Sequence, residues 1–259
     1  AQAFNELLPA SGPVRTVVMG KESTSKNQQA SRVRQFMNYY ITSVMEEYTP
    51  DMDQMLFYLP LAGSTFKKTY FDETLGRAVS KFVPAENLVV PYETSDLETC
   101  PNITQVVRMS LNDLRKRQIG GSYLDVEVIP AQKELSDLEG EMDRIEGLEP
   151  NQIDYDCTIL ECHVDLDLEG YEELDDEGEP TGIKVPYVVT LSEDNGQVLS
   201  IRRNYQEDDE LKRKIQYFTH FKFLPGFGFY GLGLIHTIGG LSRTATAALR
   251  QLIDAGTLS

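Results

Sequence analysis

Residues 215–256 read IQYFTHFKFLPGFGFYGLGLIHTIGGLSRTATAALRQLIDAG, and they decide the fold class. The stretch opens as an aromatic-rich strand that ends at Pro225, and a glycine–aromatic turn follows. An apolar stripe with steps of three and four residues then indicates one face of an α-helix. The stripe consists of Leu234, Ile238, Leu241, Ala245, Ala248, Leu249 and Leu252. Gly256 stands where a helix C-cap glycine belongs, so the sequence predicts a strand, a tight turn and a long helix.

Upstream of this stretch, apolar periodicity predicts several shorter helices. The expected helices span 1–8, 26–48, 51–58, 111–119 and 132–145. Pro50 is expected to end the second helix, because proline disrupts a helix interior. Ser110 with Asp113 three residues later resembles a capping box for the fourth.

Runs rich in β-branched and aromatic residues, several of them alternating, predict strands between these helices. The expected strands span 14–19, 65–71, 77–83, 88–92, 103–109, 123–129, 157–168, 184–191 and 197–203. Asn195-Gly196 favours a tight hairpin between the last two. Lys67 and Lys68 fall on opposite faces of one strand, so at least one of them is expected to be solvent exposed. The fold class that follows is α+β, with mixed helices and antiparallel strands forming a β-meander.

The sequence changes character near Pro150, which suggests three regions. We expect an α+β region over 1–130 and an acidic helical connector over 131–150. The region 151–259 is expected to hold a β-meander, the glycine–aromatic turn and the long helix. The chain opens at Ala1 without a charged leader, so we expect no signal peptide and a piece of a longer or processed polypeptide.

The charge of the chain excludes one class of partner contact. With 24 basic and 41 acidic residues the formal net charge is 24 − 41 = −17, whereas proteins that clamp nucleic acid need a basic face. The three cysteines are too few and too uneven for a disulfide framework, and they suit a reducing compartment. No apolar run approaches the roughly 18 residues of a membrane span.

The glycine turn offers one alternative function, a nucleotide-binding oxidoreductase. Gly226, Gly228 and Gly231 spell G-x-G-x-x-G between a strand and a helix, the arrangement that holds a pyrophosphate in dinucleotide folds. Asp254 has about the spacing of the ribose-binding acid, but it falls at a helix end rather than after a second strand. The intervening Phe and Tyr residues would also crowd a phosphate. A tight bend beside packed aromatic rings explains the glycines equally well.

A second alternative is a Ca²⁺-binding structural module. An acidic run matches positions 1, 3, 5, 6, 9 and 12 of an EF-hand-like loop, where Ca²⁺ finds its oxygen ligands. These residues are Asp165, Asp167, Glu169, Gly170, Glu173 and Asp176. A strand rather than a helix precedes the run, and its last acid is an Asp where a Glu is usual. A solvated acidic hairpin loop is the competing interpretation.

Other candidate sites fail on spacing. Cys157 and His163 share one face of an expected strand while Cys162 lies on the other, so the three cannot close a tetrahedral zinc site. The remaining histidines, His220 and His236, are scattered, and no nucleophile elbow or phosphate-binding loop is present. We therefore predict no catalytic, cofactor-binding or metal-binding residues and no enzymatic activity.

Several stretches together resemble the portal proteins of short-tailed, podovirus-type bacteriophages, over nearly the whole chain. They are QASRVRQFMNYYIT, EEYTPDMDQMLFYLPLAGSTFKK, FVPAENLVVPYETSDLETCPNITQ, KVPYVVTL, VLSIRRNY and FTHFKFLPGFGFYGLGLIHTIGGLSRTATAALRQLIDAGTL. The last of these stretches is the most specific because of its length and order. Portal chains continue well beyond such an ending, so this sequence resembles part of one.

The resemblance implies a portal-like subunit of the wing, stem and clip type, with 1–130 as a wing-like region. Such subunits form a non-catalytic ring of about twelve copies at one capsid vertex, the head–tail connector. Double-stranded DNA is packaged through its channel by a terminase and later ejected, and capsid and tail or adaptor proteins dock on the ring. The implied location is the virion, after assembly in the host cytoplasm, with no membrane partner. An acidic wall agrees with this, because it repels phosphate and lets DNA move.

Within this resemblance the long helix, 232–255, is expected to line the channel or to pack on neighbouring subunits. Its small, weakly polar face suits close packing, and consists of Ser242, Thr244, Thr246 and Ala247. Arg243 and Arg250 are hypothesised to pair with acids of the next subunit or to approach DNA. Ordinary solvation of both side chains is the competing interpretation.

Overall fold

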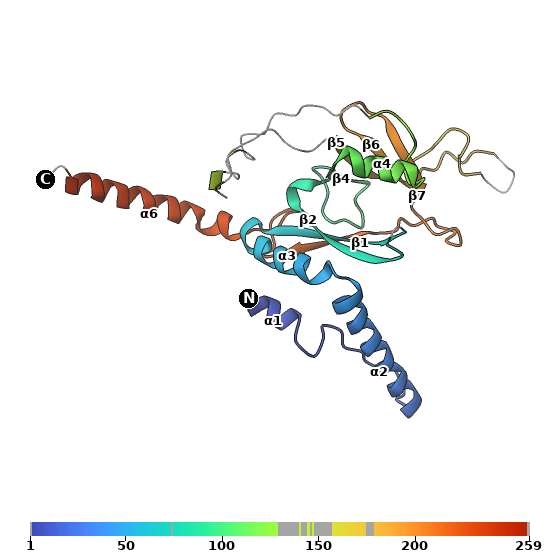
Figure 1. The fold of residues 1–259 in the computed structure, drawn as a ribbon, viewed down its shortest axis with the longest axis horizontal. Coiled ribbons are helices and arrows are strands. Elements are labelled where there is room, and N and C mark those ends of the chain that lie inside the picture. The colour runs from blue at the N-terminus through green and yellow to red at the C-terminus, as the bar shows by residue number, and fades with distance from the viewer. Residues whose placement is uncertain are drawn as a thin grey trace. The chain divides into compact units, whose positions relative to one another are not determined.

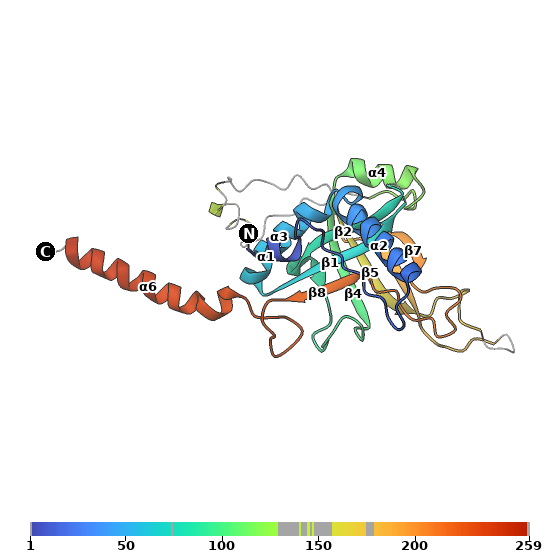
Figure 2. The same cartoon turned by 90° about the horizontal axis from the view of Figure 1, so that it is seen from below.

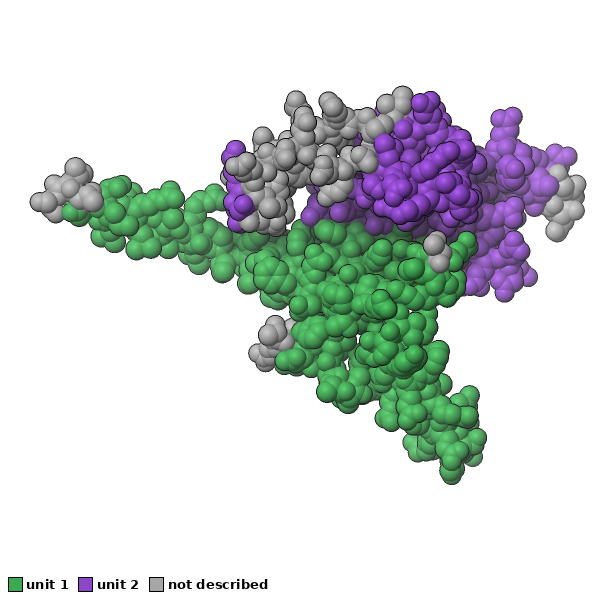
Figure 3. Space-filling view, viewed as in Figure 1, with its two compact units in different colours: residues 1–85, 216–259 green, residues 86–215 purple. Residues whose placement is uncertain are grey.

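The computed structural model describes residues 2–73, 75–128, 140, 144–145, 147, 157–174 and 179–257. Helices and antiparallel sheets are mixed in it, which confirms the α+β class. The chain divides into two compact units, one of residues 1–85 with 216–259 and one of residues 86–215 (Figure 3). This division differs from the expected regions 1–130, 131–150 and 151–259, because a strand near the C-terminal end pairs with one from the N-terminal part. The expected connector and its helix over 132–145 fall almost entirely outside the described residues.

The first unit is built on a three-stranded antiparallel sheet in the order β2-β1-β8 (Figures 1 and 2). Its strands are β1 (Ser64–Asp72), β2 (Arg77–Pro84) and β8 (Phe218–Lys222). Its helical elements are α1 (Gln2–Leu7), α2 (Thr24–Tyr39), the π-helical turn η1 (Tyr40–Val44), α3 (Tyr48–Ala62) and α6 (Leu234–Thr257). The hairpin of β1 and β2 was predicted from the sequence, and its register pairs Thr65 with Pro84 through Asp72 with Arg77.

The helix expected over 26–48 is instead α2 followed by η1, and α3 begins at Tyr48. Pro50, expected to end a helix, lies in the first turn of α3. The position tolerates proline because the first N–H groups of a helix have no intrahelical acceptor to lose. The helix then runs through Pro60 to Ala62, and Gly63 closes it in the left-handed conformation, φ +87°.

The second unit is built on a five-stranded antiparallel sheet in the order β3-β4-β5-β6-β7. Its elements are the 3-10 turn η2 (Ala85–Asn87, whose first residue belongs to the first unit), β3 (Leu88–Val89), β4 (Asn102–Met109), α4 (Leu111–Ile119), β5 (Cys157–Leu166), β6 (Val185–Ser192) and β7 (Val198–Arg203). The β-meander and the capped helix were predicted correctly, and the Ser110 side chain accepts a hydrogen bond from the Asp113 N–H. One hydrophobic cluster fills the space under α4, and includes Met109, Leu114, Val128, Cys157, Ile159 and Leu199.

Two expected strands do not form. Residues 14–19 have no regular structure and are held to α2 by Asn38, whose side chain bonds both the N–H and the carbonyl of Val14. Residues 123–128, the described part of the expected strand 123–129, make one backbone bond to β7, from the Leu124 N–H to the Leu199 carbonyl. Both segments have the composition of strands but no continuous partner strand, and a strand forms only where its backbone groups can pair with those of a neighbour.

The expected solvent exposure of Lys67 or Lys68 is wrong, because both are buried, at 4% and 9% exposed. The Lys67 ammonium lies 4.1 Å from the centre of the Tyr48 ring, on the face covered by α3. Burial, opposed by the nearby Asp51 and Glu47 carboxylates, lowers the pKa of Lys67. Lys68 lies over the rings of Tyr70 and Phe218 on the other face. Aromatic rings thus take the place of water at both cations.

Candidate assembly surface

A long exposed apolar feature of the first unit is one face of α6, a helix of 24 residues. Of its residues 234–256 only Gly239 is half-buried, and all others are exposed. The predicted apolar stripe is present as a continuous face, and its Leu241 is 72% exposed. Soluble proteins rarely leave a long apolar helix face in water, so this stripe is a candidate assembly surface. The stripe is Leu234, Ile238, Leu241, Ala245, Ala248, Leu249 and Leu252.

The opposite face of α6 carries its two arginines. At 100° per residue Arg243 and Arg250 lie within about 20° of each other and about 160° from the centre of the stripe. Both are exposed. The hydroxyls of Thr244 and Thr246 bond back to the carbonyls of Gly240 and Ser242, which removes them from contact with a partner. The helix therefore offers an apolar side and, opposite it, a charged side that carries both arginines and Asp254. The four residues of the expected weakly polar face spread over about 200° of the helix surface outside the stripe and do not form a separate face.

Glycine backbones fix the start of α6 to the junction of α3 and β1. The Gly231 N–H donates to the Ser64 hydroxyl at 2.8 Å, and the Phe223 N–H donates to the Gly63 carbonyl at 3.0 Å. A Cβ atom on Gly231 would lie 2.5 Å from the Gly63 carbonyl oxygen, and one on Gly233 would lie 2.2 Å from that of Leu61. Only glycine permits these approaches. We call Gly63, Gly231 and Gly233 the glycine clamp.

An aromatic cluster supports the clamp from the sheet. The rings of His220, Phe66 and Phe229 contact one another, with the His220 centroid 4.5 Å from Phe66 and 4.6 Å from Phe229 and the two phenylalanine centroids 5.9 Å apart. The Nε2 of His220 is 3.0 Å from the Ser64 hydroxyl oxygen. That oxygen also accepts from Gly231, and since a hydroxyl can accept two hydrogen bonds and donate one, the tautomer of neutral His220 decides which of the two side chains donates. Burial, and then the nearby Lys222 charge, lower the pKa of His220 to about 4.

Sequence reasoning identified Gly231 in the turn but missed Ser64 as its hydrogen-bond partner and His220 as the partner of Ser64. Ser64 is 167 residues from the amide that it binds, and nothing local marks it. The antiparallel pairing of β1 with β8 brings Phe66 opposite His220 and Ser64 opposite Lys222. Only the sheet register could have revealed the cluster.

The surroundings of the G-x-G-x-x-G glycines differ from those that a dinucleotide site requires. Cβ atoms on Gly226 and Gly231 would contact the carbonyl oxygens of Tyr230 and Gly63, so these close approaches are to the protein's own backbone. Gly228 has open space around its α-carbon. The preceding strand β8 is antiparallel to its neighbour β1, whereas the dinucleotide motif lies in a parallel βαβ unit.

The calcium and zinc candidates do not assemble in the described part of the chain, where no cluster of three potential metal ligands occurs. Asp165 lies in β5, Glu173 forms an ion pair with Lys212, and Asp176 falls outside the described residues. In the zinc set, the Cys157 thiol donates to the Met109 carbonyl in the hydrophobic core. His163 bonds the Glu161 carboxylate at 2.8 Å.

The third member of the zinc set, Cys162, lies beside the Thr104 hydroxyl on the opposite face of β5. The two faces anticipated from the sequence are therefore present. His236 accepts the Gly233 N–H on Nδ1 at the start of α6. The three histidines therefore lie in three different structural settings.

In comparisons with known proteins, no family model matches the chain, and no curated protein matches it significantly. Among the described helices, none combines the length and hydrophobicity that a membrane crossing requires.

Proposed function

We propose that the chain is part of a non-catalytic portal subunit, the head–tail connector of a short-tailed bacteriophage. In this proposal copies of the chain form a ring at one capsid vertex, and double-stranded DNA passes through its channel during packaging and ejection. The proposal rests on the sequence resemblance described above. The observation that carries it in the molecule is the exposed apolar stripe of α6, which needs a partner.

The partner that best fits the stripe is another copy of the same helix. A helix of 24 residues is about 36 Å long, and the apolar side chains follow its full length. Ala245 and Ala248 lower the surface at its middle, which lets a second helix approach closely. Because the stripe lies on one side and the arginines on the other, contact through it leaves the charged side free for the next neighbour or for DNA.

The charge of the chain supports a conduit rather than a clamp. At a net charge of −17 most of the surface repels phosphate, so DNA moves past without being held. Arg243 and Arg250 then supply isolated positive groups. Terminase, capsid and tail or adaptor proteins are the proposed further partners, and the virion is the proposed location.

The experiment is negative-stain imaging of the complete protein, in which rings with a central hole are expected. Leu241→Glu with Leu249→Glu should abolish them, because each change buries an unpaired charge in the helix contact. Ile119→Glu with Leu211→Glu is the matched control, since those side chains are exposed in the other unit. A complete protein that stays monomeric, or rings that survive the α6 changes and not the control changes, would remove the proposal.

A further inference from the structure

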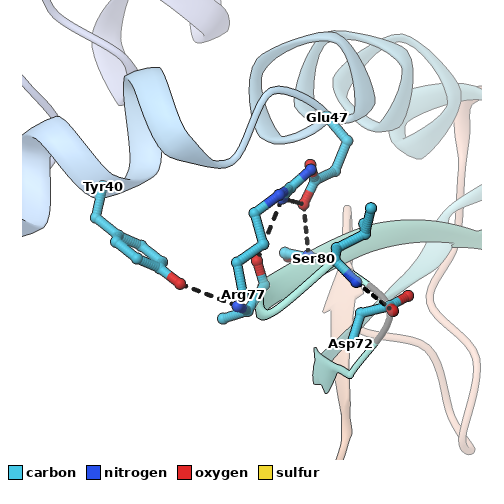
Figure 4. Close-up of polar contacts among 7 residues, drawn as sticks. Tyr40, Glu47, Asp72, Arg77 and Ser80 are labelled. Atoms are coloured by element: carbon cyan, nitrogen blue, oxygen red, sulfur yellow. Dashed lines mark hydrogen bonds and ion pairs between the residues drawn. The ribbon is translucent and has the colours of Figure 1, made fainter.

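The three-stranded sheet of the first unit has one closed edge and one open edge. Along β2, every second residue points its N–H away from β1. The N–H of Ala78 donates to the Tyr40 hydroxyl, and that of Ser80 to the Glu47 carboxylate (Figure 4). The N–H of Phe82 donates to Asp51 at 2.8 Å. The next outward position is Pro84, which has no N–H, so no outward donor of β2 is left for another strand.

The other edge, formed by β8, is covered just beyond its end, where the Leu224 carbonyl accepts the Leu232 N–H, but not along the strand itself. The Thr69 N–H donates to the Tyr217 carbonyl and the Phe223 N–H to the Gly63 carbonyl, so odd-numbered residues face β1. The even-numbered residues therefore point outward. The Phe218 N–H has a partner in the Gln216 side chain. No hydrogen bond within the described part of the chain engages the backbone N–H of His220 or Lys222.

A strand-forming segment without a strand partner lies in the same unit. Residues 14–19, VRTVVM, contain four β-branched residues and no regular structure. Val17 and Met19 are 82% and 88% exposed. Among the described residues, no hydrogen bond engages the backbone N–H groups of 15–19. The segment thus has the composition, the exposed side chains and the unused donors of a strand that is completed elsewhere.

The segment lies on the closed side of the sheet, away from its own β8. Asn38, in the last turn of α2, holds Val14, and two residues later Tyr40 caps the β2 edge. Two strand spacings, about 10 Å, separate β2 from β8. The segment 14–19 and the open β8 edge therefore lie on opposite sides of one unit, which suits head-to-tail contact between copies.

We propose that residues 14–19 of one copy add as a strand to the β8 edge of a second copy. The six residues of the segment 14–19 are enough to pair along the five of β8, and the contact supplies acceptors for the N–H groups of His220 and Lys222. The closed β2 edge makes the addition directional, because β2 cannot accept the same segment. A pairing of two β8 edges would leave 14–19 unused and would stop at a dimer. This contact is independent of the α6 stripe and of DNA passage.

The test uses a fluorescent peptide of residues 12–22, GPVRTVVMGKE, and the complete chain carrying Val17→Pro. Proline in the chain's own segment prevents it from occupying its neighbours' edges. The peptide is expected to bind saturably, and the same peptide with Val17→Pro is expected not to bind. Absence of binding by the unaltered peptide would overturn the proposal.

Variants of Lys222 locate the binding site. Lys222→Pro removes one outward donor without touching the bonds to β1, and should weaken peptide binding about fivefold. Lys222→Val keeps the N–H while losing the charge, and should change binding by less than about twofold. Equal effects of the two variants would show that the β8 edge is not the site.

Cross-linking distinguishes contact between copies from contact within one chain. Chains with Val17→Cys or Met19→Cys, mixed with chains carrying Lys222→Cys and oxidised, should give disulfide-linked dimers. Chains carrying Leu75→Cys, an exposed position of the same unit, are the control acceptors. Dimers with the control alone would overturn the proposal. Rings without peptide binding would remove strand addition only, and peptide binding without rings would remove the portal proposal only.

Discussion

At the residue scale, the glycine clamp tests whether the glycines of the G-x-G-x-x-G motif serve close backbone packing or dinucleotide binding. Gly231→Ala should lower the free energy of unfolding by about 2 kcal/mol, because a Cβ atom there would lie 2.5 Å from the Gly63 carbonyl oxygen. Gly228→Ala is the control within the same G-x-G-x-x-G, and should change the free energy of unfolding by less than about 0.5 kcal/mol, since a Cβ atom there would have no neighbour within 4 Å beyond the adjacent residues of the chain. Urea unfolding measures both. Equal losses would contradict a clamp formed by backbone contact.

His220 makes the clamp sensitive to acid. Its folded pKa is lowered to about 4 from an ordinary value of 6.5, chiefly by burial, so between these values the unfolded state binds the extra proton. The stability that neutral His220 contributes is present above pH 6.5 and is lost as the pH falls towards 4. His220→Gln should flatten this part of the stability–pH curve. Urea unfolding at half-unit pH steps would reveal an unchanged slope if the cluster is irrelevant.

Single residues also show where sequence reasoning stops. The capping role of Ser110 was predictable because its partner is three residues away. The burial of Lys67 was not, because the Tyr48 ring that receives its charge lies on a different element. Alternation along a strand assigns a residue to a face, but what covers that face is decided by tertiary packing.

At the element scale, the β2 edge depends on carboxylates from the helical layer. Asp51→Ala should destabilise the chain by about 1–2 kcal/mol, because it leaves the Phe82 N–H without its acceptor. Asp53→Ala removes the same charge from the exposed side of the same helix and should cost less than about 0.5 kcal/mol. Asp51→Asn, which keeps an acceptor oxygen, should recover part of the loss. Thermal unfolding that fails to separate Asp51→Ala from Asp53→Ala would contradict the capping.

Elements with local signals were predictable, and elements that depend on distant partners were not. The β1–β2 hairpin, the β-meander and α6 follow from alternation, turn residues and helical periodicity. The segments 14–19 and 123–128 have strand composition without a ladder, and Pro50 lies in the first turn of a helix instead of ending one. The pairing of β1 with β8 joins residues about 150 positions apart, which no local pattern encodes.

At the scale of the whole molecule, folding and assembly should respond to different residues. The apolar face of α6 is exposed along its length, so changes there remove little packing from the chain itself. Leu241→Glu with Leu249→Glu should therefore leave the melting temperature of dilute, monomeric protein within about 2 °C, while abolishing association. Gly231→Ala should instead lower the melting temperature of the monomer. A large loss of melting temperature in the α6 variant would show that the stripe is packed within the subunit.

The two arginines of α6 test how copies would meet in the proposed ring. Arg243→Glu with Arg250→Glu should weaken ring assembly or DNA packaging, because each reversal replaces attraction with repulsion from the acids of the next copy or from phosphate. One exposed ion pair contributes only about 0.5 kcal/mol, but the contribution repeats at every interface of a closed ring. Arg243→Lys with Arg250→Lys keeps both charges and should assemble normally. Wild-type rings should also loosen as salt rises, since exposed pairs are screened. If charge reversal changes neither assembly nor packaging, both arginines are ordinary solvated helix residues, and the apolar stripe alone holds the copies together.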